Sequence, residues 1–267
     1  MNKKIITLIV LFPIFNFVIA DEIFKSENHS FSIETVVDEL EYPWSMEFTS
    51  DGKILITERP GRLRIFENGE LSAPIKGLPE IKVEGQGGLL DIALDSDFIN
   101  NKILFFSYSA GNLLGIGTEV SSAKLVNDEL KELKLLFKAL PKSRGGRHFG
   151  SRLLLTNDNS LYITLGDRGE MKRAQNINDH AGSLIRINKD GEIPNDNPFI
   201  KRSDAKAEIY TYGNRNIQGI ALNPVTYDIW TVEHGPQGGD ELNLMKPGIN
   251  YGWPVITYGV NYGTGTQ

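Results

Sequence analysis

The feature that most constrains the fold of this chain is a unit that recurs four times along it. Each copy has an apolar run, a polar turn and a short β-rich run ending in Thr or Ser: SMEFTSDGKILIT, LLDIALDSDFINNKILFFS, SRLLLTNDNSLYIT and GIALNPVTYDIWT. The copies end at Thr57, Ser107, Thr164 and Thr231, so the period drifts upward from 50 through 57 to 67 residues. Such a period fits units of about four strands with loops of variable length. We therefore predict an all-β chain that folds as a β-propeller, with about four blades present.

A β-sandwich of similar strand content is the alternative architecture, because the four copies share little sequence identity. Helical periodicity is scarce: only residues 127–136 fit it, and they could equally form a strand, a turn and a second strand.

The hairpins are followed by polar, Gly-rich segments such as ERPGR, GDRGE and EHGPQGGDE. Equivalent loops of a propeller open on one face around the central channel, so we expect function there.

The N-terminus predicts export. Residues 1–20 have the three-part layout of a secretory signal, with Lys3 and Lys4, then an apolar run, then Ala20 as the expected cleavage position. The mature propeller domain would then cover residues 21–267. An uncleaved anchor is the alternative, although the apolar run is short for a membrane span. An exported protein without cysteine depends on a sizeable core for its stability. An export signal combined with the absence of cysteine suits a bacterial periplasm.

The charge pattern argues against nucleic acid as a partner. Loss of Lys3 and Lys4 with the signal takes the formal net charge from −6 to −8. The remaining acidic and basic residues are interspersed, without a basic tract that could follow a phosphate backbone. We expect an acidic protein that has no nucleic-acid partner and no membrane span after signal cleavage.

Four polar, glycine-containing clusters are candidates for the functional loops: EGQGGLLD (84–91), GGRHFGSR (145–152), YGNRNIQG (212–219) and EHGPQGGDELN (233–243). Glycines let backbone approach a ligand closely. Gln86 could contact a polar ligand from its turn or simply be solvated. His148 is a natural proton acceptor near neutral pH, and its alternative role is a loop histidine bonded to backbone.

Two further groups of polar atoms point to ligands. Arg215 and Asn216 offer a cationic fork and an amide suited to carboxylates or carbonyl oxygens, or they could brace their own loop. The carbonyls of Gly235 and Pro236, together with the acidic pair Asp240-Glu241, are oxygen donors of the kind that Ca²⁺ prefers. Asp167, in GDRGE, could orient a base, accept from a ligand hydroxyl or occupy an ordinary turn.

These clusters in this order, followed by NYGWP, are what carries a family resemblance. From about residue 42 to residue 267 the sequence resembles the soluble quinoprotein sugar dehydrogenases, the glucose/sorbosone dehydrogenase family, and is especially similar to its aldose sugar dehydrogenase branch. The resemblance implies a six-bladed propeller that binds pyrroloquinoline quinone (PQQ) with Ca²⁺ and oxidises the C1 hydroxyl of aldoses to a lactone. It also implies roles by position: His148 as the general base, Asp167 near the substrate, Gln86, Arg215, Asn216 and Tyr262 at the cofactor, Gly235 and Pro236 on its Ca²⁺, and Glu241 and Tyr251 at a second, structural Ca²⁺.

The chain stops at Gln267, before the later blades that the family pattern implies, and we expect a C-terminally truncated gene or gene fragment. Two other functions stay open: a Ca²⁺-dependent lactonase that uses acidic residues and metal-bound water, and a non-catalytic exported binding module. The sequence leaves the preferred sugar, the electron acceptor and the oligomeric state undetermined.

Overall fold

The computed structural model describes residues 23–266, and the chain divides into two compact units, Met1–Asp38 and Glu39–Gln267. The predicted signal at residues 1–20 lies outside the described residues. In the first unit, β1 (Ile23–Lys25) pairs antiparallel with β2 (Ser30–Ser32), and the rings of Phe24 and Phe31 stack between them. Within residues 23–266, no helix has the length and apolar character needed to cross a membrane.

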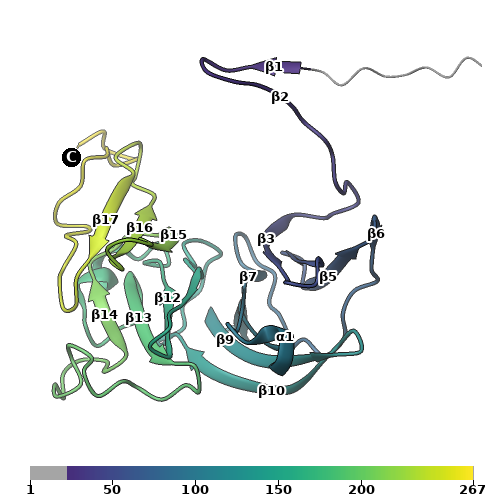
Figure 1. Cartoon of the computed structure of the whole chain (residues 1–267). Helices are drawn as coiled ribbons and strands as arrows, with labels where there is room; N and C mark the ends of the chain where they lie inside the picture. The colour runs from purple at the N-terminus through teal and green to yellow at the C-terminus, as the bar shows by residue number, and fades with distance from the viewer. Residues whose placement is uncertain (1–22, 267) are drawn as a thin grey trace, which may run out of the picture. The chain divides into compact units, whose positions relative to one another are not determined.

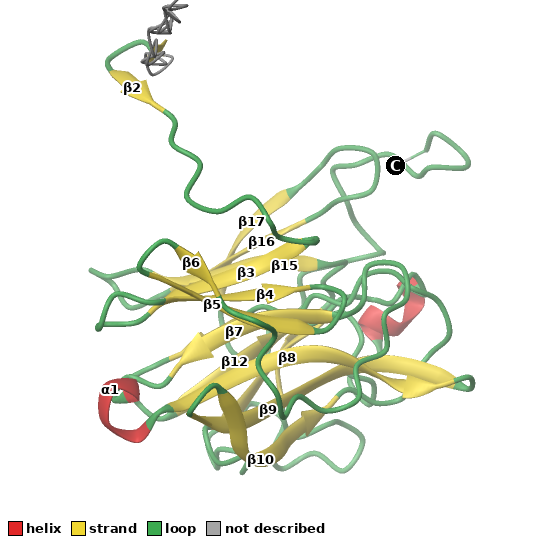
Figure 2. Cartoon of the chain, turned by 90° about the vertical axis from the view of Figure 1, so that its right-hand side faces the viewer, coloured by secondary structure: helices red, strands yellow, loops and turns green. Residues whose placement is uncertain are grey.

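The second unit is built from four successive antiparallel sheets, which follow one another in chain order along an arc (Figure 1), and strands make up most of its regular structure (Figure 2). The first contains β3 (Pro43–Phe48), β4 (Ile54–Glu58), β5 (Arg62–Glu67) and β6 (Glu70–Leu71). The second contains β7 (Leu89–Leu94), β8 (Ile103–Asn112), β9 (Gly115–Val126) and β10 (Glu129–Lys138). The third contains β11 (Leu153–Leu155), β12 (Ser160–Thr164), β13 (Ser183–Asn188) and β14 (Ile209–Tyr212). The fourth contains β15 (Ile217–Leu222), β16 (Ile229–Glu233) and β17 (Glu241–Met245).

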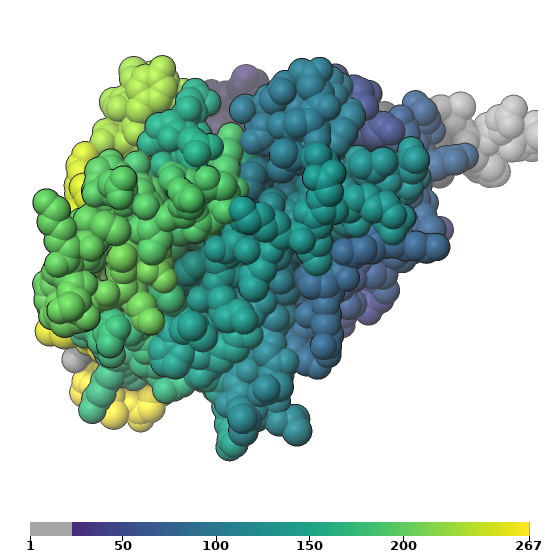
Figure 3. Space-filling model, turned by 90° about the horizontal axis from the view of Figure 1, so that it is seen from below, coloured from purple at the N-terminus to yellow at the C-terminus, as the bar shows by residue number. Residues whose placement is uncertain are grey.

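Four sheets in this order are the four blades of a β-propeller, so the predicted all-β architecture is confirmed. The helical content of the described residues is one turn of α1 (Phe98–Asn101) and the 3₁₀ segment η1 (Met171–Gln175). From below, the space-filling view shows the blades as adjoining sectors coloured in sequence order (Figure 3).

The four recurring sequence units correspond to the first two strands of each blade. The predicted ends fall in β4, β8, β12 and β16, although β8 continues five residues past Ser107. Residues 127–136 are not helical: they form the turn after β9 and most of β10, within a strand–turn–strand segment. Asn127 and Asp128 both have positive φ, 50° and 56°, which is the backbone that a two-residue hairpin turn requires and that Asn and Asp tolerate.

The core lies between neighbouring sheets. Leu55 and Leu104, both fully buried, belong to the cluster between the first and second blades. Leu161 and Ile185 lie in the next cluster, between the second and third blades. Burying a side chain of this size contributes about 1.5–3 kcal/mol, so each blade is stabilised mainly by its neighbours.

Buried hydroxyls join the blades at equivalent places. At the first three junctions, a side-chain hydroxyl from the second strand of one blade donates to a backbone carbonyl of the next: Thr57 to Leu90 at 2.6 Å, Ser107 to Ser151 at 2.7 Å and Thr164 to Ile217 at 3.1 Å. Thr231 is the equivalent residue of the fourth blade. Its hydroxyl is buried and has no partner among the described residues, so this position does not repeat the contact.

A buried carboxylate connects the first three blades. Asp91, on β7, accepts from the Ser45 hydroxyl at 2.6 Å and from the backbone N–H of Leu153 at 2.7 Å. The Arg152 guanidinium lies 3.1 Å from the same carboxylate and stacks over the Trp44 ring. Burial raises the pKa of Asp91, and these donors offset part of that effect.

Candidate active site

The polar loops meet at one end of the sheets. In an antiparallel blade, the start of the first strand and the end of the second strand lie at the same edge. The clusters at 84–91, 145–152 and 212–219 precede first strands, whereas GDRGE and EHGPQGGDE follow second strands. Chain topology therefore brings these segments together, as the functional prediction required.

His148 lies on a loop that packs closely against its neighbour. The backbone N–H of Gln86 donates to the carbonyl of Gly146 at 2.7 Å. A Cβ on Gly85, whose φ is +57°, would lie 2.2 Å from the same carbonyl oxygen, so only glycine fits there. His148 itself has a φ of 54°, an uncommon conformation for a residue other than glycine.

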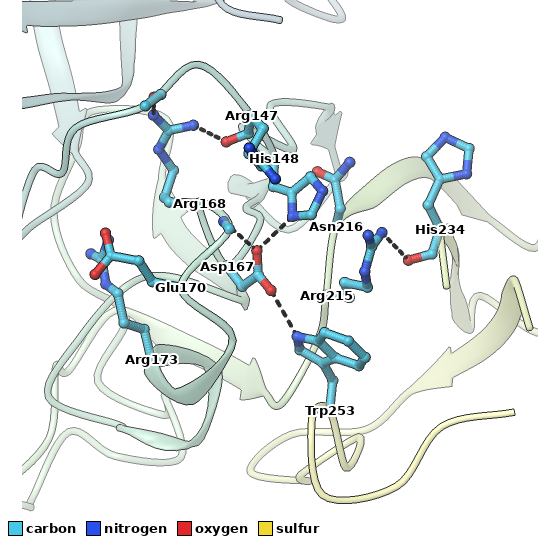
Figure 4. Close-up of polar contacts among 12 residues, drawn as sticks. Arg147, His148, Asp167, Arg168, Glu170, Arg173, Arg215, Asn216, His234 and Trp253 are labelled. Carbon is cyan, nitrogen blue, oxygen red and sulfur yellow. Dashed lines mark hydrogen bonds and ion pairs between the residues drawn. The ribbon is translucent and has the colours of Figure 1, made fainter. Parts of the chain in front are cut away.

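Arg168 fixes this loop through hydrogen bonds to its backbone. Its guanidinium is buried, donates to the carbonyl oxygens of Gly145 and Arg147, and lies 3.5 Å from the centre of the Phe149 ring (Figure 4). Burial lowers the pKa of Arg168 to about 10, which still leaves it cationic at neutral pH. Two charge-assisted hydrogen bonds to backbone thus position the residue before His148.

His148 forms a dyad with Asp167. Its Nδ1 lies 2.6 Å from Oδ1 of Asp167, which also accepts from the backbone N–H of Gly169 at 2.6 Å. The other oxygen, Oδ2, accepts from the indole Nε1–H of Trp253 at 2.8 Å (Figure 4). Because a carboxylate only accepts, we assign the proton to Nδ1, which leaves Nε2 of His148 as the basic nitrogen. Of the roles considered for Asp167, the geometry supports orientation of the base.

Gln86 and Asn216 line a cleft of about 380 Å³ that opens beside this dyad. The Gln86 Oε1 accepts from the backbone N–H of His148 at 2.7 Å, so its amide nitrogen is directed elsewhere. The Asn216 Oδ1 accepts from Gly150 at 3.2 Å and from the Gln218 amide at 3.1 Å. Both predicted cofactor residues therefore also organise the loops on which they lie.

Arg215 is nearly buried, with 9% of its surface exposed, and its guanidinium donates to the carbonyl of His234 at 3.1 Å. It lies 5.5 Å from the centre of the Trp253 ring. The buried carboxylate of Glu233 accepts from the backbone N–H groups of Arg215 and Asn216 at 2.5 and 3.3 Å. Burial raises the pKa of Glu233 to about 7. Sequence reasoning missed this supporting carboxylate, although it begins the EHGPQGGDELN cluster.

A second cleft, of about 520 Å³, is lined by five of the ten predicted site residues. Six of its lining residues are His148, Asp167, Arg215, Pro236, Trp253 and Tyr262. Tyr262 is 69% exposed at its edge. Trp253, from the NYGWP segment, lies against both Asp167 and Arg215. The two clefts have the size of small-molecule sites.

The predicted calcium residues lie on the loop after β16. Asp240 accepts from the backbone N–H of Gly235 at 2.9 Å, whereas the carbonyls of Gly235 and Pro236 accept no hydrogen bond from the described residues. Within residues 23–266 there is no group of three or more His, Cys, Asp or Glu that could hold a metal. Free carbonyl oxygens are hard ligands and fit Ca²⁺, so a metal here would be held through backbone as well as side chains.

Glu241 and Tyr251, the predicted ligands of the second Ca²⁺, form hydrogen bonds with different partners. Glu241 accepts from the Asn243 amide at 3.3 Å, and its charge contributes to the raised pKa of Glu233. The Tyr251 hydroxyl donates to the carbonyl of Leu244 at 2.6 Å, and its backbone N–H donates to Tyr212. No hydrogen bond among residues 23–266 links these two predicted ligands of the second Ca²⁺.

Comparisons with known proteins all indicate one family. A family model described as Glucose / Sorbosone dehydrogenase matches residues 40–267. Aldose sugar dehydrogenase YliI of Escherichia coli strain K12 is 43% identical over 236 residues, and the match covers 86% of this chain and 64% of that protein. The chain therefore spans slightly less than two thirds of the length of this curated relative.

Solved structures share the fold. The soluble aldose sugar dehydrogenase from Escherichia coli in its apo form is 42% identical, with a TM-score of 0.85 over 88% of this chain and 69% of that one. A PQQ-bound structure of aldose sugar dehydrogenase from Streptomyces coelicolor is 26% identical, with a TM-score of 0.75 over 88% of this chain and 69% of that one.

Proposed function

The chain belongs to the glucose/sorbosone dehydrogenase family, and on that premise we propose that it oxidises the C1 hydroxyl of an aldose to the lactone, with PQQ as the acceptor. The observation that carries this proposal is the His148–Asp167 pair, at 2.6 Å, in a cleft that also contains the buried Arg215 guanidinium. A base held by a carboxylate beside a fixed cation is what removal of a hydroxyl proton with hydride transfer needs.

The protein's own part in the reaction is proton transfer. Nε2 of His148 takes the proton of the C1 hydroxyl, and the electron pair of that O–H bond forms the lactone carbonyl as hydride leaves C1. Asp167 stabilises the imidazolium that results, because its Oδ1 accepts from Nδ1. The Trp253 indole and the Gly169 N–H keep the carboxylate in position during the transfer.

When bound, PQQ supplies the two-electron hydride acceptor, and Ca²⁺ polarises its carbonyl. Gln86, Arg215, Asn216 and Tyr262 would hold the cofactor, which is consistent with the amides and the guanidinium that line the two clefts. The carbonyls of Gly235 and Pro236 would bind its Ca²⁺. We assign Glu241 and Tyr251 to a second, structural Ca²⁺, on family resemblance alone.

The proposal also includes location and partner. Residues 1–20 support export to the periplasm, where the reduced cofactor would pass electrons to an external acceptor whose nature is open.

The test is reconstitution of the purified mature chain with PQQ and Ca²⁺, followed by reduction of an artificial dye on addition of aldoses. His148→Asn should lower kcat by about 10²–10⁴-fold while PQQ absorbance still shows cofactor binding. His29→Asn, an exposed histidine in the first unit, is the matched control and should keep full activity. Cofactor binding without dye reduction by any aldose would contradict the proposal, and lactone hydrolysis without PQQ would support a lactonase.

A further inference from the structure

The second cleft, which contains His148, is lined by more cationic than anionic side chains. Its lining includes two guanidinium groups, Arg147 and Arg215, and one carboxylate, Asp167. Asp167 accepts from three donors, and Arg215 donates to the His234 carbonyl against the Trp253 ring. The Arg147 guanidinium has no hydrogen bond and no ion pair with any residue between 23 and 266. This cation lines a cleft in a chain whose net charge is −6.

Packing holds Arg147 in the cleft. A Cβ on Gly169 would lie 2.7 Å from Cδ and 3.0 Å from Cγ of Arg147, so the arginine stem crosses the glycine closely. Gly169 belongs to the turn whose N–H binds Asp167, and Arg168 donates to the Arg147 carbonyl. The guanidinium is therefore carried by the same turn that orients the base, although the residue as a whole is exposed.

We propose that Arg147 makes this cleft selective for aldoses that carry a carboxylate, the hexuronic acids as a chemical class. A planar guanidinium binds a carboxylate through two parallel, charge-assisted hydrogen bonds, whereas a neutral sugar has no anion to pair with it. In the pyranose form of a hexuronic acid the C5 carboxylate and the C1 hydroxyl are on either side of the ring oxygen, so the neighbouring residues Arg147 and His148 would each have a separate group to bind. This inference rests on the proposed function, because it names the substrate class of the same cleft.

A carboxylate of the cofactor is the other source of the same chemistry. Arg215 is the guanidinium that is buried against Trp253 inside the cleft, whereas Arg147 is exposed. We therefore assign the cofactor to Arg215 and the sugar carboxylate to Arg147.

The experiment measures sugar binding without an external electron acceptor, so that each bound cofactor can turn over once at most. D-glucuronate and D-glucose are titrated into the full mature chain, wild type and Arg147→Gln, with and without PQQ and Ca²⁺, and dissociation constants are taken from calorimetry or ligand-observed NMR. The wild type should bind glucuronate at least about tenfold more tightly than glucose, and Arg147→Gln should remove about ten- to hundredfold of glucuronate affinity without changing that for glucose. Arg147→Lys should restore part of it.

Arg144→Gln is the matched control, because Arg144 is exposed on the same loop but lines a different pocket. It should leave both affinities unchanged. Equal binding of the two sugars by the wild type, equal losses for both in Arg147→Gln, or no sugar binding would overturn the inference. So would weaker PQQ binding in Arg147→Gln with unchanged glucuronate affinity, since the carboxylate would then be the cofactor's. Absent dye reduction with intact glucuronate selectivity would reject only the proposed dehydrogenase.

Discussion

Asp167 is the residue on which the geometry of the candidate base depends. Oδ1 of Asp167 accepts from His148 and Oδ2 accepts from Trp253. Because the carboxylate is rigid, each bond limits the orientations that the other ring can adopt. Neither donor can be replaced by water without loosening the ring orientation, because Asp167 is only 1% exposed. A proton acceptor must be held within hydrogen-bond reach of its proton, and this pair of contacts provides that restriction.

Removing these contacts should therefore affect turnover more than sugar affinity. We expect Asp167→Asn to lower kcat by about 10²–10⁴-fold and Trp253→Phe, which keeps a ring but loses the N–H, by about tenfold. KM for the sugar should change little in either variant. Dye-reduction kinetics of the reconstituted protein measure both quantities. A large rise in KM at constant kcat would instead place Asp167 in sugar binding.

Glu58 should make stability depend on pH. Burial alone would raise the pKa of Glu58, but donors from Arg62, Arg64 and the Glu41 N–H hold it below its ordinary value of 4.5. A lowered folded pKa means that the stabilisation is complete above pH 4.5 and is lost as pH falls through the folded value. Glu58→Gln should lower the free energy of unfolding by about 1–3 kcal/mol at pH 7, and the difference should shrink in acid.

Urea unfolding at several pH values measures this difference. Glu132→Gln, at an exposed ion pair with Lys124, is the control and should change stability by less than about 0.5 kcal/mol. A Glu58→Gln difference that is the same at neutral and acid pH would show that the carboxylate charge is not responsible.

At the scale of elements, local sequence was sufficient for the hairpins and insufficient for the contacts between loops. The alternation of apolar runs and turn residues predicted the strands, because backbone pairing within a hairpin is local. Residues 127–136 stayed ambiguous since the apolar spacing fits both structures, and the Asn127-Asp128 turn decided in favour of strands. Trp253 and Asp167 lie 86 residues apart, and no local pattern indicates that their loops meet.

The contact between two loops predicts different outcomes for two glycines. Gly85→Ala should displace the His148 loop, because its Cβ would lie 2.2 Å from the Gly146 carbonyl oxygen. Gly145→Ala meets nothing within 4 Å and should cost only the strain of its positive φ, about 1 kcal/mol. We expect Gly85→Ala to lose more stability in thermal unfolding and most of the dye-reducing activity. Equal effects of the two variants would show that the close approach is unimportant.

At the scale of the whole molecule, the outermost sheets expose apolar side chains. Met46 and Phe48, on β3, are 58% and 66% exposed, and Val232 and Leu242, paired across β16 and β17, are 46% and 66% exposed. The sequence predicted blades but did not indicate which faces would be covered, because every blade has the same alternating pattern. Exposed apolar patches of this kind favour association.

We therefore expect the protein to associate as its concentration rises, and sedimentation velocity measures this directly. Val232→Thr combined with Leu242→Lys should shift the distribution toward the monomer. Leu113→Lys, at a hairpin tip that is 95% exposed, is the control and should have no such effect. Identical sedimentation of all three proteins at every concentration would exclude the sheet face as the cause.

The indole bond to Asp167 has a consequence for the order in which this protein becomes competent during synthesis. His148 and Asp167 leave the ribosome first, and the third blade can form around them while Trp253 is still unmade. The carboxylate receives its last donor only after the fourth blade has followed. Synthesis therefore separates formation of the His148–Asp167 pair from its last contact, and chains that stop between residues 213 and 252 would keep the pair but lack the indole donor to Asp167.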